Sequence, residues 1–474
     1  MSTLHLTLLH TNDLHGRVKQ VARIGTLVRR IKDAVNSTGV TCLYLDAGDS
    51  EDSILLESAF TQGSAMDAIL RGAGCDQVAL GNAIPTRYGI QAIEKLAESF
   101  GKPLLCGNMY WKDGLIPPGL KPYVIEELEE YKLGIIGLTA PVDAYKIFNA
   151  EVQLPEESAP ALIEQVRDEG ADLVILLSHL GLKNDIRLAE KVNGISVIIG
   201  GHSHDRIKTP LLINDTLIEM AGELGEILGR LNLEIDPTSS KVTYCYEQHI
   251  PVNEQTPEDK YVLKVIDKEK QRARQMMNIE IGVLLEPQEL TEDKECRAGN
   301  LLADALLEHF PGAQASFVMG EHWEKGLDAG ALTKGQLYDA NRSTGNPAKV
   351  ELTGGQLEQF FLAALKPENM TKPLPVLRGR VPGLPHVAGM QVIAYGSEPY
   401  RVEIFIDNRL VTAEERVTVV TSDLEISGYL NYLVIPDEEV VYDVPTILPE
   451  VVEAYIHRHS PLGNVGVGRI TFAE

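Results

Sequence analysis

Short apolar runs alternate with segments of helical periodicity from residue 4 to about residue 205, and this alternation limits the fold more than any other feature of the chain. The apolar runs predict strands, and strand followed by helix, repeated, is typical of an α/β layered domain. The predicted strands are Leu4–Leu9, Cys42–Leu45, Gln77–Leu80, Leu104–Cys106, Leu133–Leu138, Leu173–Leu177 and Val197–Ile199. Segments such as Ile90–Ser99 and Ala159–Asp168 have the helical period.

The pattern changes between about residues 210 and 250, where short apolar runs are broken by Asn214-Asp215 and by residues 237–240. This spacing predicts antiparallel hairpins that close the first domain. Thr256-Pro257-Glu258-Asp259 then offers an N-cap hydroxyl, a proline at the first helical position and acids in the first turn. A polar connecting helix is therefore predicted from Thr256 to about Asn278.

A second α/β block follows, with helical patterns at Asn300–Glu308 and Gly355–Leu365 and strand patterns at Tyr400–Ile406 and Val417–Thr421. The predicted organisation is a first domain at 1–254, a linker helix at 255–279 and a second domain at 280–474. A chain of 474 residues is long enough for two or three domains with their own cores.

The charge balance restricts the partners of this chain. It has 43 Lys and Arg against 68 Asp and Glu, so its formal net charge is −25. A net anion is repelled by a nucleic-acid backbone and by an anionic membrane, so neither is expected as a partner. No run approaches the roughly 18 apolar residues of a membrane span.

The N-terminus and the cysteines favour a cytoplasmic location. Met1–Leu9 has no cationic region and its apolar run contains His5, so a strand is expected there and not a signal peptide. The five cysteines are odd in number, widely spaced and without a CxxC pair, which is typical of reduced thiols.

Polar clusters with metal-binding side chains directly follow several of the predicted strands. Because the carboxyl ends of parallel strands meet at one edge of an open α/β sheet, these clusters are expected to converge there. Carboxylate, amide and imidazole together suit a dinuclear site for Mn²⁺, Zn²⁺, Fe²⁺ or Mg²⁺. The clusters are Asp13-x-His15, Gly48-Asp49, Gly81-Asn82, Ser178-His179 and Gly200-Gly201-His202-Ser203-His204.

The order of these clusters resembles that of the calcineurin-like metallophosphoesterases, and LLHTNDLHGR, LDAGDS, LLSHLG and GGHSH resemble the bacterial 5′-nucleotidase family. The resemblance implies a four-layer αββα sandwich followed by an α/β 5′-nucleotidase C-terminal domain that binds substrate. It also implies two divalent metal ions. One would be held by Asp13, His15, Asp49 and His204, and the second by the bridging Asp49 with Asn82, His179 and His202.

A bridging carboxylate is physically required, because two cations about 3.5–4 Å apart repel each other. Asp49 is predicted to bridge, and Asp49, Asn82 and His179 are the predicted catalytic residues. The metals would convert a bridging water to hydroxide for attack on phosphorus. Asp46 is the alternative bridge; because it ends the strand itself, we interpret it as structural.

The sequence departs from the family at the residue after the predicted asparagine ligand. The family continues as Gly-Asn-His-Glu, whereas this chain has Gly81-Asn82-Ala83. Alanine cannot donate a proton, so a general-acid contribution of about 10²–10⁴ in rate is missing unless another group supplies it. Arg87 and His10 are the nearby candidates.

The second domain departs as well. Glu324 stands where the family has a phosphate-binding arginine, and Ser343-Thr344-Gly345-Asn346 replaces an element that supplies a stacking aromatic ring. Tyr432 and Tyr429 remain able to stack on a base. The predicted substrate-binding residues are Tyr432, Tyr429 and Asn346.

The leading hypothesis is metal-dependent hydrolysis of phosphate esters by a 5′-nucleotidase-type phosphatase with altered substrate recognition. Two alternatives stay open: hydrolysis of a UDP-sugar or other nucleotide phosphoanhydride, and a catalytically weak relative that binds metal and a nucleotide. The expected partner is a small phosphate ester, a nucleotide, and the expected state is a monomer or weak dimer.

Overall fold

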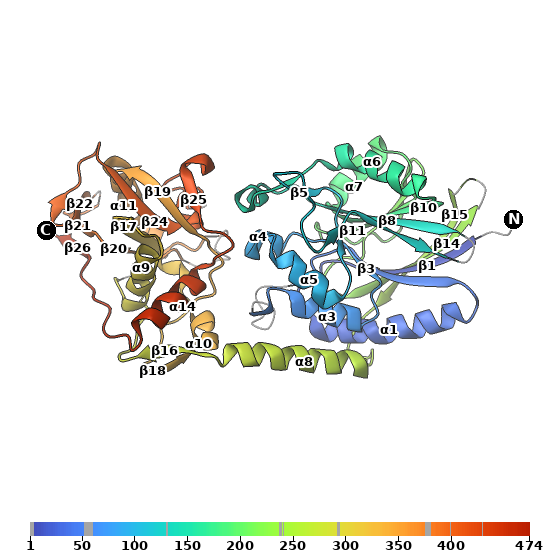
Figure 1. Cartoon of the computed structure of the whole chain (residues 1–474), viewed down its shortest axis with the longest axis horizontal. Helices are drawn as coiled ribbons and strands as arrows, with labels where there is room; N and C mark the ends of the chain where they lie inside the picture. Colours follow the sequence, from blue (N-terminus) through green and yellow to red (C-terminus); the bar gives the residue numbers. More distant parts are fainter. Residues whose placement is uncertain are drawn as a thin grey trace. The chain divides into compact units, whose positions relative to one another are not determined.

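The computed structural model describes residues 4–51, 60–128, 131–236, 239, 241–291, 294–374, 381–398, 400–428 and 430–474. The chain divides into two compact units, Met1–Ala273 and Arg274–Glu474, each built from strands and helices (Figure 1). The predicted α/β class is confirmed in both units.

Two sheets form the centre of the first unit. One has five strands in the order β15-β14-β1-β2-β3, and the other has six in the order β12-β13-β11-β10-β8-β7. The first comprises β1 (Leu4–Thr11), β2 (Thr41–Asp46), β3 (Gln77–Val78), β14 (Ile227–Asp236) and β15 (Lys241–Pro251). The second comprises β7 (Tyr123–Glu127), β8 (Lys132–Thr139), β10 (Leu173–His179), β11 (Val197–Gly200), β12 (Leu211–Ile213) and β13 (Thr216–Glu219).

Apolar side chains from the two sheets meet in one buried cluster that includes Leu6 and Leu8 of β1 and Ile175 of β10. Helices cover the outer faces, so the unit has the predicted four layers (Figure 1). A second cluster lies between the six-stranded sheet and two helices, α6 (Pro155–Asp168) and α7 (Leu182–Lys191). On the other side lie α1 (Val18–Asn36), α3 (Ser64–Gly72), α4 (Pro85–Tyr88) and α5 (Ala92–Phe100).

The smaller elements of the first unit connect these layers. They are β4 (Leu104–Leu105), β5 (Met109–Trp111), β6 (Leu120–Lys121), η1 (Asp143–Phe148) and β9 (Ala150–Val152). The two predicted hairpins exist, and they extend different sheets: β12 and β13 pair in the six-stranded sheet, β14 and β15 in the five-stranded one.

The predicted start of the connecting helix is wrong. Helix α8 runs over Lys260–Met277, and its N-terminal N–H groups are capped by Asp259 and not by Thr256. Oδ1 of Asp259 accepts from the N–H of Tyr261 at 2.8 Å and of Val262 at 3.0 Å. The carboxylate of Asp259 also forms an ion pair with Arg29. The uncharged hydroxyl of Thr256 cannot form an ion pair, so this tertiary contact favours Asp259 as the cap.

The second unit contains a five-stranded sheet in the order β20-β17-β24-β19-β25 and a four-stranded sheet in the order β23-β22-β21-β26. The strands of the first are β17 (Ala315–Met319), β19 (Pro347–Thr353), β20 (Pro385–Ala388), β24 (Arg416–Ser422) and β25 (Val440–Tyr442). Those of the second are β21 (Gln391–Tyr395), β22 (Arg401–Ile406), β23 (Arg409–Leu410) and β26 (Ile470–Ala473), and β16 (Glu280–Leu284) pairs with β18 (Gly330–Thr333).

Helices α9 (Arg297–His309) and α11 (Gly354–Ala364) lie where the sequence predicted them and pack on these strands. The core of this unit centres on Phe317, Phe360 and Phe361, whose rings contact one another. The other helices are η2 (Gly320–His322), α10 (Lys334–Ala340), α12 (Pro367–Thr371), α13 (Asp423–Ile426), η4 (Asp437–Glu439) and α14 (Leu448–His459). Among the helices of the described residues, none has both the length and the apolar character that a membrane crossing requires.

Candidate metal centre

The predicted metal-binding side chains lie on loops at the carboxyl ends of strands in both sheets of the first unit. Strands β1, β2 and β3 are mutually parallel, and so are β8, β10 and β11. Parallel pairing brings the carboxyl ends of each set to one edge of its own sheet. The sequence predicted a single sheet edge, whereas the residues come from two sheets whose loops meet at Asp13, Asp49 and His179. The seven residues are Asp13, His15, Asp49, Asn82, His179, His202 and His204.

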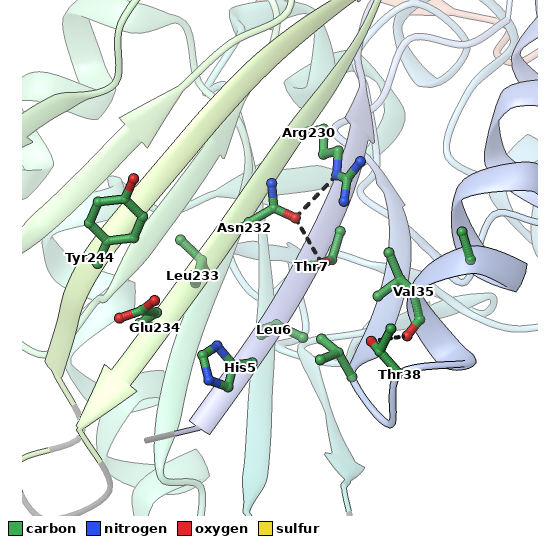
Figure 2. Close-up of a pocket in the computed structure, with 12 residues that line it drawn as sticks. His5, Leu6, Thr7, Val35, Thr38, Arg230, Asn232, Leu233, Glu234 and Tyr244 are labelled. Carbon is green, nitrogen blue, oxygen red and sulfur yellow. Dashed lines mark hydrogen bonds between the residues drawn. The ribbon is translucent and has the colours of Figure 1, made fainter. Parts of the chain in front are cut away.

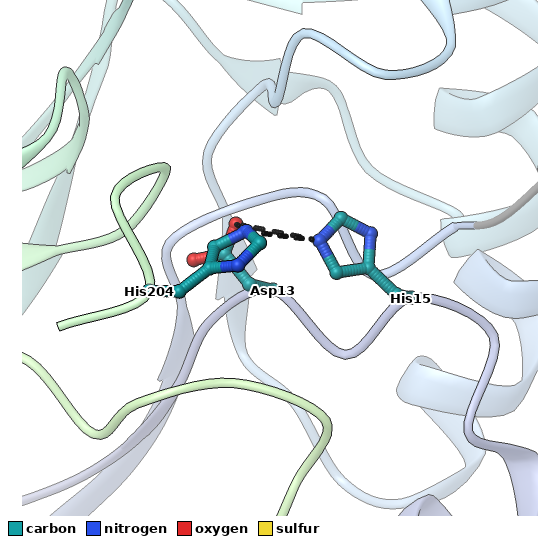
Figure 3. A group of neighbouring side chains, drawn as sticks. All are labelled: Asp13, His15 and His204. Atoms are coloured by element: carbon teal, nitrogen blue, oxygen red, sulfur yellow. Dashed lines mark hydrogen bonds and ion pairs between the residues drawn. The ribbon is translucent and has the colours of Figure 1, made fainter. Parts of the chain in front are cut away.

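Asp13, His15 and His204 form one group (Figure 3). Oδ1 of the buried Asp13 lies 3.4 Å from Nε2 of His204 and 3.8 Å from Nε2 of His15, and the two Nε2 atoms are 3.2 Å apart. The other carboxylate oxygen of Asp13 accepts hydrogen bonds from Asn12 and from the backbone of His202. Oδ1 itself has no hydrogen-bond partner among the described residues.

The second group joins Asp49, Asn82, His179 and His202. Nε2 of His179 lies 3.2 Å from Oδ2 of Asp49 and 3.1 Å from Oδ1 of Asn82. The rings of His179 and His202 are edge to face with centroids 5.1 Å apart. Asp13, Asp49 and His179 also present donor atoms within 4.8 Å of one another, so the two groups overlap.

Backbone conformation sets these loops apart. Asp13, His15, Asp49, His202 and His204 all have φ between 43° and 75°. Non-glycine residues rarely adopt this left-handed region, and each such residue costs on the order of 1–3 kcal/mol. Five of the twelve described non-glycine residues with positive φ are thus predicted ligands, a concentration that strained functional loops show.

The contact between Asp49 and His179 favours the charged form of each group, and a cation bound at Nε2 of His179 would take the place of its proton. Burial works against both charges, but their mutual attraction and the 3.2 Å contact outweigh it. The pKa of Asp49 is therefore below its ordinary value and that of His179 above it. The N–H of Ala83 donates to Asp49 at 2.8 Å and further favours the carboxylate.

Asp46 supports the loop and does not face the two groups. Its Oδ1 accepts from the N–H of Gly48 at 3.0 Å and the hydroxyl of Ser50 at 2.9 Å, and Oδ2 accepts from Thr11 at 2.5 Å. These hydrogen bonds tie the turn that carries Asp49 to the end of β1, in keeping with the structural interpretation from sequence.

Sequence reasoning missed the residues that orient the imidazoles. Nδ1 of His204 lies 2.9 Å from Oε2 of Glu223, and Nδ1 of His179 lies 2.8 Å from the carbonyl oxygen of Ala47. Such contacts fix the ring and its tautomer and leave Nε2 for a ligand. Asn12 was detectable as the neighbour of Asp13, whereas no pattern marks Glu223, which is 19 residues beyond His204.

A surface hollow of about 360 Å³ lies elsewhere in the first unit, near the amino end of β1 (Figure 2). Oδ1 of Asn232 in its wall accepts from Thr7 at 3.0 Å and from Arg230 at 3.1 Å. This is the sheet end opposite to the one where α/β sheets place their ligands. We therefore assign no role to it.

Comparisons with known proteins agree with the geometry. The 5′-nucleotidase C-terminal domain matches residues 280–433. The chain is 24% identical over 457 residues to the uncharacterized metallophosphoesterase YunD of Bacillus subtilis (strain 168), across 94% of this chain and 98% of YunD. It is 26% identical over 348 residues to the 5′-nucleotidase of Bos taurus, across 64% of this chain and 59% of that protein. Residues 280–433 thus match the C-terminal domain of 5′-nucleotidases, and the chain is similar over most of its length to a metallophosphoesterase.

The names of these relatives support phosphoester hydrolysis by this chain. The solved structure of the NAD nucleotidase NadN of Haemophilus influenzae has the same fold, with a TM-score of 0.64 and 17% identity over 100% of both chains. The two-domain 5′-nucleotidase architecture predicted from the sequence is thereby confirmed.

The family's missing imidazole is not replaced by His10. That residue is 0% exposed and lies among the side chains between the sheets, so it cannot reach a substrate. The prediction that His10 could replace the family's general acid is therefore wrong. Arg87 is partly exposed on α4, five residues beyond Asn82.

Two of the predicted substrate-binding residues, Tyr432 and Asn346, lie in the described part of the second unit, and both are buried. Tyr432 is 6% exposed, its ring packs against Phe360, and its hydroxyl donates to the carbonyl of Asn369. Asn346 is 3% exposed and its amide donates to the carbonyl of Thr446 at 2.8 Å. Both are committed to the packing of the unit, and Tyr429 lies outside the described residues.

Proposed function

We propose that this protein is a dinuclear-metal-dependent phosphatase of the 5′-nucleotidase type with altered substrate recognition, acting on small phosphate esters such as nucleotides. Its metals would be two divalent ions of the Mn²⁺, Zn²⁺, Fe²⁺ or Mg²⁺ class. The overlap of two donor groups at Asp13 and Asp49 carries the proposal. Asp13, His15, Asp49 and His204 would hold one ion, and Asp49, Asn82, His179 and His202 the other.

The side chains fit such ions. Oδ1 of Asp13 is buried without a hydrogen-bond partner among the described residues, and it faces two imidazole Nε2 atoms within 3.8 Å. A carboxylate oxygen left in this way is costly unless a cation or donor meets it. Two imidazoles and one carboxylate are a donor set that borderline divalent metals accept.

The chain's own groups position the reaction. Asp49 supplies negative charge between the two donor groups, and the carbonyl of Ala47 and the carboxylate of Glu223 orient His179 and His204. When bound, a pair of divalent ions acidifies a water and stabilises charge on phosphoryl oxygens. The left-handed loops keep these groups in place before substrate arrives.

Ala83 favours a second candidate within the same chemistry, a nucleotide phosphoanhydride hydrolase. Without an imidazole there, protonation of the leaving oxygen is weakened, and this matters most for a poor leaving group such as a nucleoside alkoxide. Phosphate and phenolate leave without that help. We expect p-nitrophenyl phosphate or a UDP-sugar to be hydrolysed faster than AMP.

The test combines metal content with turnover. Purified protein reconstituted with Mn²⁺ should hold two equivalents that are lost in an Asp13→Asn, Asp49→Asn chain. It should hydrolyse p-nitrophenyl phosphate and a UDP-sugar faster than AMP, and it should lose activity to a chelator. His204→Asn should lose activity, whereas the matched control His5→Asn, an exposed histidine on β1, should keep it.

Two results would separate the alternatives. AMP as the best substrate would contradict the argument from Ala83. Two bound metals without turnover on a wide panel of phosphate esters would instead support a catalytically weak binding protein.

A further inference from the structure

A second cluster of metal-competent side chains lies in the first unit, where β13 and β15 meet. Nε2 of His249 is 2.8 Å from Oε1 of Glu219 and 3.2 Å from Oε1 of Glu247. The three donor atoms lie within 4.8 Å of one another. The side chain of Glu219 is 0% exposed, that of His249 9% and that of Glu247 16%. Sequence reasoning gave none of these residues a role.

A fourth side chain, the fully buried His10, is directed at the same place. His10 of β1 pairs with Gly229 of β14, and Gly229 pairs with His249 of β15. Directly paired residues lie on the same face of a sheet, so the three form one row. Nε2 of His10 is 2.1 Å from where a Cβ on Gly229 would stand. The imidazole therefore lies over the glycine and extends towards β15.

Some buried polar atoms of His10 and of the three-residue cluster have no hydrogen-bond partner among the described residues. Within the described part of the chain, neither ring nitrogen of His10 has a hydrogen-bond partner, and neither does Oε2 of Glu219. Their neighbours between the sheets are apolar, as Leu8 and Leu217 show. A buried group without a partner is rare in folded proteins and calls for a ligand or a water. Here one such group, Oε2 of Glu219, belongs to the three-residue cluster, and the other, the ring of His10, lies beside it.

A buried histidine and glutamate in the second unit, His322 and Glu425, have their polar atoms satisfied. Nδ1 of His322 lies 2.8 Å from the hydroxyl of Ser343 and Nε2 lies 3.0 Å from Glu425. Glu425 also accepts from the N–H of Met319 at 2.9 Å and from the hydroxyl of Ser422. Both ring nitrogens and both Glu425 oxygens are used, so these two residues are explained as a buried ion pair.

We propose that Glu219, Glu247, His249 and His10 form a third divalent-cation site, separate from the dinuclear centre and structural in role. Two imidazoles and two carboxylates make a four-donor set of the kind Zn²⁺ binds in closed structural sites. The two carboxylates neutralise the charge of one divalent ion. The site joins β1 and β15 of one sheet to β13 of the other, at the end of the sandwich core.

Two groups of the proposed site are neutral at neutral pH. Burial, and then the neighbouring Glu247, raise the pKa of Glu219 to about 9, so a cation that binds there displaces its proton. Burial, and then the neighbouring His249, lower the pKa of His10 to about 3, so its imidazole is neutral and keeps a lone pair. Nε of Arg206 lies 3.4 Å from Nδ1 of His249. Metal binding at Nε2 of His249 moves the ring proton to Nδ1, and the exposed Arg206 side chain must then turn towards solvent.

The experiment measures bound Zn²⁺ per chain after reconstitution with Zn²⁺ alone and removal of excess ion. The native chain should retain three equivalents. Glu219→Gln, which keeps the shape of the side chain, and His249→Asn should each retain two and keep phosphatase activity. Asp13→Asn combined with Asp49→Asn should retain one equivalent and be inactive.

A thermal readout covers the case in which a variant folds poorly. Zn²⁺ should raise the Tm of the Asp13→Asn, Asp49→Asn chain, and adding Glu219→Gln should abolish that rise. Native stoichiometry in the Glu219→Gln chain, or no Tm response in the Asp13→Asn, Asp49→Asn chain, would overturn the third site. A native chain that loses its only equivalent with Glu219→Gln would instead refute the dinuclear centre.

Discussion

Substitution of Gly81 by alanine tests the proposed metal geometry with a single methyl group. A Cβ on Gly81 would stand 2.1 Å from Oδ1 of Asp49 and 2.3 Å from its backbone nitrogen, whereas real Cβ contacts under 3.0 Å are essentially never found. Asp49 must therefore move by about 0.9 Å, the difference between 2.1 and 3.0 Å. The backbone at Gly81 is not left-handed, so the effect comes from the added atom alone.

A displacement of this size at a group that positions reacting atoms costs about 10²-fold in rate, or roughly 2.7 kcal/mol in transition-state free energy. We expect kcat/KM of Gly81→Ala for p-nitrophenyl phosphate with Mn²⁺ to fall by about that factor. The matched control is Gly463→Ala, because a Cβ there meets no atom within 4 Å. Near-native activity in a folded Gly81→Ala protein would refute the role of Asp49.

Three further outcomes are expected. Asp259→Ala should destabilise the protein by about 1 kcal/mol or more through loss of the α8 cap, whereas Thr256→Ala should not, as urea unfolding would show. Gly229→Ala should cost about 1–3 kcal/mol because its Cβ would collide with the His10 ring; an unchanged Tm would contradict the row of paired residues. Burial lowers the pKa of His322, but Glu425 and its other carboxylate neighbours raise it to about 8. Because its ordinary value is 6.5, its stabilising charge is complete below pH 6.5 and lost as the pH rises through 8, so the Tm difference between native protein and His322→Gln should shrink over that window.

The layered fold and the convergence of the strand-end loops could be predicted because both follow from local patterns. Parallel pairing places Asp13 beside Asp49 at one end of their sheet, and the packing of the second sheet on the first brings His179 to them. The left-handed backbone of His15 and His204 could not be predicted, because nothing in their residue type demands it.

The remaining features could not be predicted, because they depend on contacts between residues far apart in the sequence. Tyr432 has the residue type of a stacking group, but only its packing against Phe360 shows that the ring belongs to the core. Glu219 and His249 are 30 residues apart on strands of different sheets, and sequence spacing carries no sign that they touch. The helix cap at Asp259 likewise depends on an ion pair with Arg29, which is far away in the sequence.

The unfavourable features of the first unit concentrate where cations are proposed. Five of the proposed ligand residues have a left-handed backbone conformation. Among the described residues, Oδ1 of Asp13 has no hydrogen-bond partner, and His10 and Glu219 bury polar atoms without a partner in apolar surroundings. Each is costly in the folded chain and absent from the unfolded one. A ligand that meets these atoms only in the folded state must therefore stabilise the fold, by an amount that grows with its free concentration. The stability of this unit should then depend on divalent metal in two separable steps, one lost with Asp49→Asn and the other with Glu219→Gln.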